Sequence, residues 1–242
     1  LGLTFDSRLS PDWRLEMAAS DYATPTDISR TPTTAACVAG GIGYCQPGAQ
    51  GGAGRTTFAD GTGWRNVDLK AVWKPSQGQA GHAVTFGYHW DEYRIASTQY
   101  NATQWYDDST VTTRRNRFSG KTATEALYVQ DAWKITPRWT ATVGWRYERW
   151  RAFDGERFDV AAPLLGATYL YPSRSEHLNS PKASLSFQAT PDWLLRASLA
   201  RAYRMPTVSE LFQTETRGGV TFISNPNLKP EKVLAKDLSA EK

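Results

Sequence analysis

Apolar and polar residues alternate along most of this chain. Between positions 139 and 148, for example, the odd-numbered residues are Trp, Ala, Val, Trp and Tyr, whereas the even-numbered ones are Thr, Thr, Gly, Arg and Glu. Successive side chains of a strand point to opposite faces, so each alternating segment predicts a strand with one apolar and one polar face. The same split recurs around positions 1–9, 66–73, 84–91, 183–187 and 193–199. Helix signals are almost absent.

Tight turns separate some of these predicted strands. Pro presets φ at the second position of a turn and Asp bonds the neighbouring backbone, so each Pro-containing tetrapeptide should reverse the chain within a few residues. Three of them end in Trp, and a looser fourth one follows Trp73; they are Ser10–Trp13, Thr136–Trp139, Thr190–Trp193 and Trp73–Gly78. We interpret all four as hairpin tips.

Long polar stretches lie between consecutive tips, at roughly 23–63, 100–120 and 153–178. Short turns at one end and long loops at the other are typical of a bacterial outer-membrane barrel, with its short periplasmic turns and long extracellular loops. We therefore predict an all-β fold, an antiparallel transmembrane β-barrel of which about nine strands are present.

A soluble β-sandwich also alternates, so the pattern alone leaves that class open. Two features favour the membrane. The predicted strands are long enough for the roughly 9–11 residues that a tilted strand needs to cross the hydrocarbon. Tryptophans also cluster beside the predicted turns, as in an interfacial girdle; they are Trp13, Trp73, Trp133, Trp139 and Trp193. Asp131 shares the apolar face of its strand, where a charge near the membrane edge would cost about 0–1 kcal/mol.

Composition narrows the class further. The 28 basic and 24 acidic residues give a net charge of +4 and form no basic stripe, so nucleic-acid binding is not expected. Cys37 and Cys45 are eight positions apart and are expected to form a disulfide in an oxidising compartment, with a pair of free thiols as the alternative. They lack partners with ligand spacing, so neither a metal site nor a cofactor is predicted. Both ends of the chain, at Leu1 and Lys242, look cut, which indicates a fragment.

The last third of the chain carries a specific motif. Tyr203–Leu211 reads aromatic-Arg-x-Pro-Thr-x-x-Glu-Leu, and Asn225–Glu231 reads Asn-Pro-Asn-Leu-Lys-Pro-Glu. In this order and separation the two segments closely resemble the TonB-dependent receptor family, with weaker similarity at Tyr128–Trp133 and Gly144–Glu148. The motif residues, expected to be structural, are Arg204, Pro206, Glu210, Asn225, Pro226, Asn227, Leu228, Pro230 and Glu231.

The resemblance implies a barrel of about 22 strands whose lumen holds a plug domain. Residues 1–242 would then be part of that barrel domain, with the plug and the barrel C-terminus missing. It also implies multi-pass insertion in the outer membrane, contact with lipid and lipopolysaccharide, and energised uptake of a scarce nutrient complex such as a ferric siderophore. The energy would come from the TonB-ExbB-ExbD complex acting through the plug. A passive porin is the alternative.

Ligand contacts are expected in the long extracellular loop near positions 100–117. Aromatic rings offer flat apolar contact and arginines capture anionic oxygens, as a ferric siderophore requires. The candidates are Trp105, Tyr106, Arg114, Arg115 and Arg117. We predict that replacing Arg114 and Arg115 by Ala weakens uptake of an anionic chelate. The loops do not identify the ligand.

Enzymatic function is not expected. Such chemistry needs a positioned base, for which the three histidines, His82, His89 and His177, are the candidates. His89 shares the polar face with Asp91, but no serine stands beside it in a nucleophile context.

Overall fold

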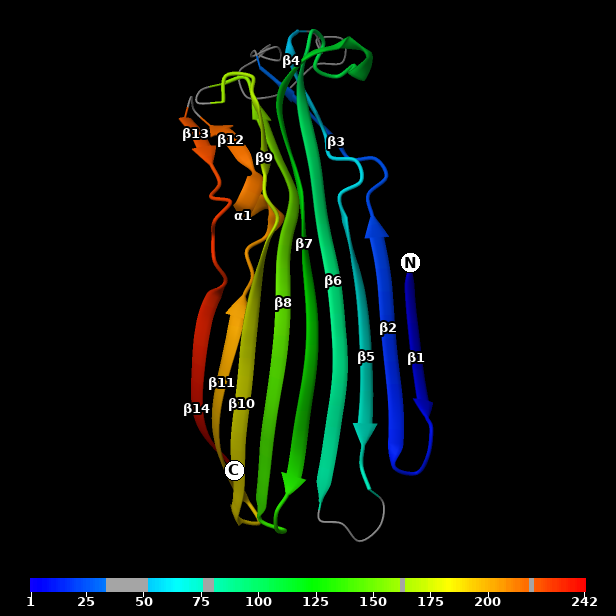
Figure 1. Ribbon diagram of the computed structural model, residues 1–242, viewed down its shortest axis with the longest axis vertical. Helices are drawn as coiled ribbons and strands as arrows, with labels where there is room; N and C mark the ends of the chain where they lie inside the picture. The colour runs from blue at the N-terminus through cyan, green and yellow to red at the C-terminus, as the bar shows by residue number, and fades with distance from the viewer. Residues whose placement is uncertain (34–51, 76–80, 162–163, 218–219) are drawn as a thin grey trace.

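A computed structural model describes residues 1–33, 52–75, 81–161, 164–217 and 220–242. Nine strands form one continuous antiparallel path in the order β1-β2-β5-β6-β7-β8-β10-β11-β14 (Figure 1). Their bounds are β1 Gly2–Arg8, β2 Trp13–Ala23, β5 Gly63–Trp73, β6 His82–Ala102, β7 Val111–Lys134, β8 Trp139–Asp159, β10 Arg174–Thr190, β11 Trp193–Arg204 and β14 Glu231–Glu241. The sheet is a section of barrel wall, and the predicted all-β class and strand number are confirmed.

Shorter elements lie beside this path. They are β3 Ile28–Pro32, β4 Gly54–Phe58, β9 Thr168–Tyr171, β12 Thr214–Arg217, β13 Val220–Ile223, the 3-10 turn η1 Asp108–Thr110 and the helix α1 Val208–Phe212. The short turns gather at one end of the sheet and these additional elements at the other (Figure 1). Neither α1 nor η1 has the length and apolar character that crossing a membrane requires.

Three predicted hairpin tips are confirmed. Residues 9–12 join β1 to β2, residues 135–138 join β7 to β8, and residues 191–192 join β10 to β11. In the second turn the Thr136 side chain accepts hydrogen bonds from the backbone N–H groups of Arg138 and Trp139, at 3.2 and 3.1 Å, which closes the reversal. Part of the looser turn after Trp73, and both Cys37 and Cys45, lie outside the described residues.

The strand register keeps one face of the sheet apolar across its width. Leu69 pairs with Tyr88, Tyr88 with Leu127, and Leu127 with Tyr147. A register slip of one residue would turn each set to the other face, so the alternation and the observed pairing support one another. Side chains of this face are open to the surroundings, with Leu127 58% and Val143 62% exposed. A soluble sandwich would bury such a face under a second sheet, and the described chain has no such sheet.

Asp131 is the exception on that face, and the structure gives it a partner. Its Oδ2 lies 2.7 Å from Nδ1 of His82, whose ring stacks on Trp133 with centroids 5.2 Å apart. Trp133 is one residue from the end of β7, so this pair lies beside a short turn. The charge on the apolar face is therefore placed at its edge.

The predicted long loops are partly wrong. β6 continues to Ala102 and β7 begins at Val111, so most of the stretch 100–120 is strand. Residues 23–63 contain the hairpin β3–β4, and residues 153–178 contain the end of β8, β9 and the beginning of β10. Backbone groups pair in ladders here as they do elsewhere. Where both faces meet water, however, strands need no apolar alternation, so their sequence looks like that of a loop.

Candidate functional site

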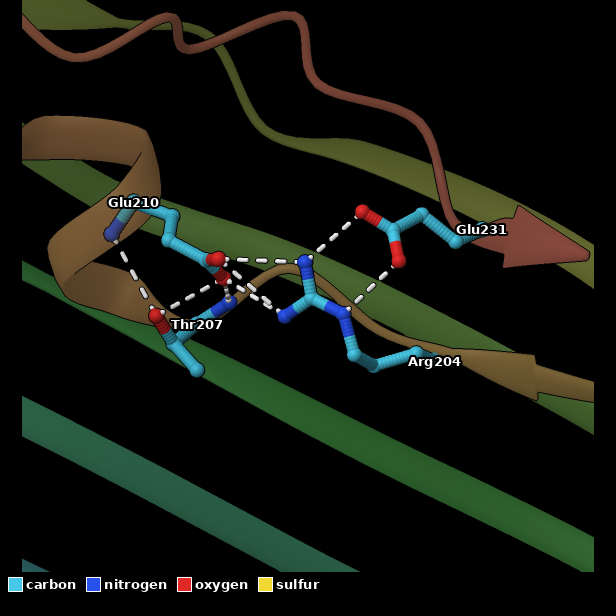
Figure 2. A network of polar contacts seen from close by, with 4 residues as sticks. All are labelled: Arg204, Thr207, Glu210 and Glu231. Carbon is cyan, nitrogen blue, oxygen red and sulfur yellow. Dashed lines mark hydrogen bonds and ion pairs between the residues drawn. The ribbon is translucent and has the colours of Figure 1, made fainter.

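The family-like motif forms a network of charges where β11 meets β14. The Arg204 guanidinium donates to both carboxylates of the motif: it lies 3.1 Å from Glu210 and 2.9 Å from Glu231 (Figure 2). Arg204 and Glu231 are also register partners in the sheet. One guanidinium thus joins the end of one strand, the beginning of the next and the helix between them, with carboxylates on two sides.

Thr207 was not among the candidates from sequence, although its spacing carried the signal. Its hydroxyl accepts from the backbone N–H of Glu210 at 3.3 Å, and the Glu210 carboxylate accepts from the backbone N–H of Thr207 at 2.9 Å. This is a capping box, for which Thr-x-x-Glu is the sequence signature. The Thr207 backbone bond, aided by its hydroxyl and by Arg204, lowers the pKa of Glu210. The box explains why so short a helix forms.

The helix α1 packs on the polar face of β8. Val208, Leu211 and Phe212 are buried there with Trp150 and Ala152, and they form the main apolar cluster of the described residues. The Phe212 ring stacks on Tyr171 with centroids 5.4 Å apart. The acidic and basic residues of the motif therefore hold an apolar anchor in place.

Two glycines make room for that anchor. The β7–β8 register shifts between Ser119 and Lys121, so Gly120 faces a bulge that contains Gly155. A Cβ at Gly120 would lie 2.5 Å from the Phe212 ring, and one at Gly155 would lie 2.6 Å from it. Only residues without a side chain fit this contact. We call Gly120, Gly155, Trp150 and Tyr171 the Phe212 socket.

The second half of the motif is a compact turn before β14. The Asn225 side-chain oxygen accepts a hydrogen bond from the backbone N–H of Asn227 at 2.9 Å. The backbone carbonyl of Asn225 accepts one from the backbone N–H of Leu228 at 3.2 Å. The carbonyl of Leu228 accepts from Arg174 at the beginning of β10. Pro226 and Pro230 lie in this turn outside the ladders, whereas Pro206 is buried between β11 and α1.

The predicted ligand residues do not form one loop. Trp105 and Tyr106 lie in the connection 103–110, but Arg114, Arg115 and Arg117 lie in β7, so placing them in a loop is wrong. Arg117 has an ion pair with Glu156 at 3.3 Å. Arg114 lies 4.0 Å from the centre of the Phe158 ring. Both guanidinium groups are thus engaged by β8.

Trp105 and Tyr106 differ in how far they are engaged by the rest of the protein. Trp105 packs against Gly54 of β4, and its backbone N–H donates to the carbonyl of Gly52 at 3.0 Å. An ion pair between Arg30 and Asp108 holds the same connection to β3. Tyr106 is 47% exposed, so it is the aromatic ring of this pair that remains open to a ligand.

Arg115 and Arg55 form a pair of cations that sequence spacing could not reveal. No carboxylate within the described ranges forms an ion pair with either side chain, and the Nε atoms of both are buried without a hydrogen-bond partner there. Burial, with a contribution from the charge of Arg115, lowers the pKa of Arg55. Two neighbouring guanidiniums with unused donors favour an anion.

The histidines are held by neighbouring polar groups. Nδ1 of His89 lies 2.7 Å from Asp68 and its Nε2 lies 2.9 Å from Asp91. Nδ1 of His177 lies 2.6 Å from the hydroxyl of Tyr147. Across the described ranges, no three His, Cys, Asp or Glu side chains are grouped so that they could hold a metal ion.

Comparison with known proteins shows the family of this chain and the structures that share its fold. The model of the family "TonB dependent receptor-like, beta-barrel" matches residues 1–241. Among solved structures, the copper transporter OprC is 14% identical with a TM-score of 0.63, and the match covers 99% of this chain and 36% of that one. The unliganded ferric citrate transporter FecA is 15% identical with a TM-score of 0.61, covering 99% and 31%. The ferric yersiniabactin uptake receptor FyuA from Yersinia pestis is 14% identical with a TM-score of 0.56, covering 99% and 32%.

A search of curated protein sequences gives no match. The chain spans about a third of the length of these three structures. At such low identity they show the fold, while the family model covers almost the whole chain. The chain belongs to the family of TonB-dependent receptor β-barrels.

Proposed function

We propose that this chain is part of the barrel domain of an outer-membrane receptor that takes up an anionic metal chelate, most simply a ferric siderophore. The exposed apolar face would contact lipid, and the polar face would line a lumen occupied by a plug. The TonB-ExbB-ExbD complex would supply energy through that plug. Three of the similar structures are named for ferric complexes, ferric citrate, yersiniabactin and catecholate, and one is named for copper.

The observation that carries the anionic ligand is the pair Arg55 and Arg115. Arg55 lies in β4 beside Gly54, which Trp105 of the connection 103–110 contacts, and Arg115 lies in β7 five residues after that connection. The Tyr106 ring of the same connection is exposed. Carboxylate, catecholate or hydroxamate oxygens would accept hydrogen bonds from the two guanidinium groups. Arg157 adds to this chemistry, because it is only 8% exposed and its Nε and Nη1 atoms have no hydrogen-bond partner within the described ranges.

Single substitutions distinguish a ligand site at Arg55 and Arg115 from the ligand-binding loop that the sequence predicted. In the full-length receptor, Arg115→Ala should weaken binding of an anionic ferric chelate about 10- to 100-fold, since a charge-assisted hydrogen bond contributes about 1.5–3 kcal/mol. Arg114→Ala should change it little, because Arg114 already lies over Phe158. Binding and uptake of radiolabelled iron in a panel of ferric complexes would measure both. Equal loss in the two variants would contradict the proposed site.

A passive porin remains the second function to test. Uptake by a porin would be unchanged in cells without TonB, whereas uptake by the receptor would stop. The ligand panel and the TonB-deficient strain thus test different parts of the proposal.

A further inference from the structure

Charged side chains follow the apolar residues on the same face of several neighbouring strands. On β8, ten residues separate Trp139, beside the short turn, from Arg149. A tilted strand crosses the hydrocarbon in about 9–11 residues, so Arg149 lies at the far membrane boundary. The register places Arg65 of β5 in one row with Glu92, Ala123 and Arg151.

Arg149 and Arg151 point to the lipid side. They continue the odd-numbered series that contains Val143 and the 47% exposed Trp145. The even-numbered Trp150 and Ala152 are buried under α1 on the opposite face. A pocket of about 390 Å³ lies beside both arginines and is also lined by Phe153 and residues 173–175.

A third cation completes this patch. Lys121 of β7 and Arg151 lie on the same Phe153 ring, each 5.6 Å from its centre. Two carboxylates partly neutralise the group: Asp154 lies 2.9 Å from Lys121, and Glu125 lies 3.2 Å from Arg151. On the adjacent β6, Glu92 and Arg94 face the same side and balance one another in charge.

Arg149 is the cation left over. Glu125 lies directly opposite it in the register but bonds to Arg151 instead. Among the described residues, no carboxylate is within ion-pair distance of Arg149, and its side chain is exposed. A guanidinium with free donors at a membrane boundary, next to a pocket and a second arginine, is suited to a phosphate group, which it can bind through two parallel hydrogen bonds.

We propose that Arg149, Arg151 and Lys121 form a binding site for the phosphate of an outer-leaflet lipid headgroup. The site rests on the proposed membrane location of the barrel, and it is independent of the nutrient transported. The acyl chains would lie along Val143, Trp145 and Tyr147 on the same strand, which places the phosphate at the level of the arginines. Basic residues at a membrane surface each attract anionic lipid by an amount equivalent to about a fivefold change in affinity.

The test uses the full-length receptor in detergent and lipid A as the probe, with native mass spectrometry as the readout. Arg149→Gln should weaken retention of lipid A about fivefold, and Arg149→Gln with Arg151→Gln about thirtyfold. Lipid A stripped of its phosphates should bind all variants equally weakly. Arg149→Lys should keep part of the affinity, since the charge remains while the paired donors are lost.

Arg65→Gln is the matched control, because Arg65 is a cation of the same register row that lies three strands away from the site on β8 and is bonded to Asp21 at 2.8 Å. Its effect should be small. Equal losses for Arg65→Gln and Arg149→Gln would show unspecific attraction and overturn the site, as would unchanged lipid A retention in the double variant. Chelate uptake by the double variant should stay normal, so a failed lipid site is distinguishable from a failed receptor assignment.

Discussion

The two ends of β8 belong to one strand but are stabilised differently. From Trp139 to Glu148 the strand alternates, and Trp139, Val143 and Trp145 on its apolar face are exposed. From Trp150 to Asp159 nearly every second residue is buried within the protein, under α1 and β9. Among the described residues, the apolar core thus lies at the end of the sheet that carries α1, and the motif helix builds it.

The largest effect is expected at the Phe212 socket. Phe212→Ala should destabilise the region around α1 by about 3–5 kcal/mol, because a buried ring is replaced by a cavity. Hydrogen exchange of α1 and the adjacent part of β8 in the full-length receptor measures it. Phe222→Ala is the control, since Phe222 is 58% exposed and its loss should change stability by only about 0.5 kcal/mol. Similar exchange in both variants would mean that α1 is not anchored by this ring.

A charge near the centre of the apolar belt should have the next largest effect. Val143→Arg is expected to cost about 2–4 kcal/mol, because its side chain faces the membrane midplane. Thr142→Arg is the control at the same depth, and it should cost much less on the polar face. Urea titration of the receptor in lipid vesicles compares the two. Equal costs would contradict the assignment of the two faces.

A smaller effect is expected at the capping box. Thr207→Ala should destabilise α1 by about 1 kcal/mol, because the N-cap hydroxyl is lost. Thr207→Ser should restore most of that stability. Hydrogen exchange of residues 208–212 measures both variants, and unchanged protection in Thr207→Ala would contradict a role for the cap.

The same box predicts a pH dependence. The folded structure lowers the pKa of Glu210 below its ordinary value of 4.5. The stabilisation is therefore complete above that pH and is lost as the pH falls through the lower, folded value. Protection of α1 should decrease in acid, and Glu210→Gln should remove that dependence. A variant that kept the acid sensitivity would assign it to another group.

Sequence patterns predicted the part of the sheet beside the short turns well, because there one face is apolar and the other polar, so the side chains alternate. The turn at Thr136 and the apolar series from Trp139 follow from local rules. The patterns failed for Arg114 and Arg117, which looked like loop residues. In the extended strands both faces carry polar side chains, so the pattern there no longer distinguishes a strand from a loop.

The motif shows the same limit. Thr207 and Glu210 have the spacing of a capping box, so the helix α1 was readable in the sequence. The partner of Phe212 was not, because Gly120 and Gly155 are distant in the chain and meet only through the shifted register of β7 and β8. The neighbouring cations Arg55 and Arg115 likewise belong to separate strands.

By itself the sequence determined the alternating strand segments, their two faces, three tight turns and the family-like motif, since these depend on neighbouring residues and on the two-residue period of a strand. The tertiary structure decided which distant residues meet: the Phe212 socket, the partners of Arg204, and the neighbouring cations Arg55 and Arg115. Such contacts depend on strand register and bulges, which couple residues far apart in the chain and leave no local pattern.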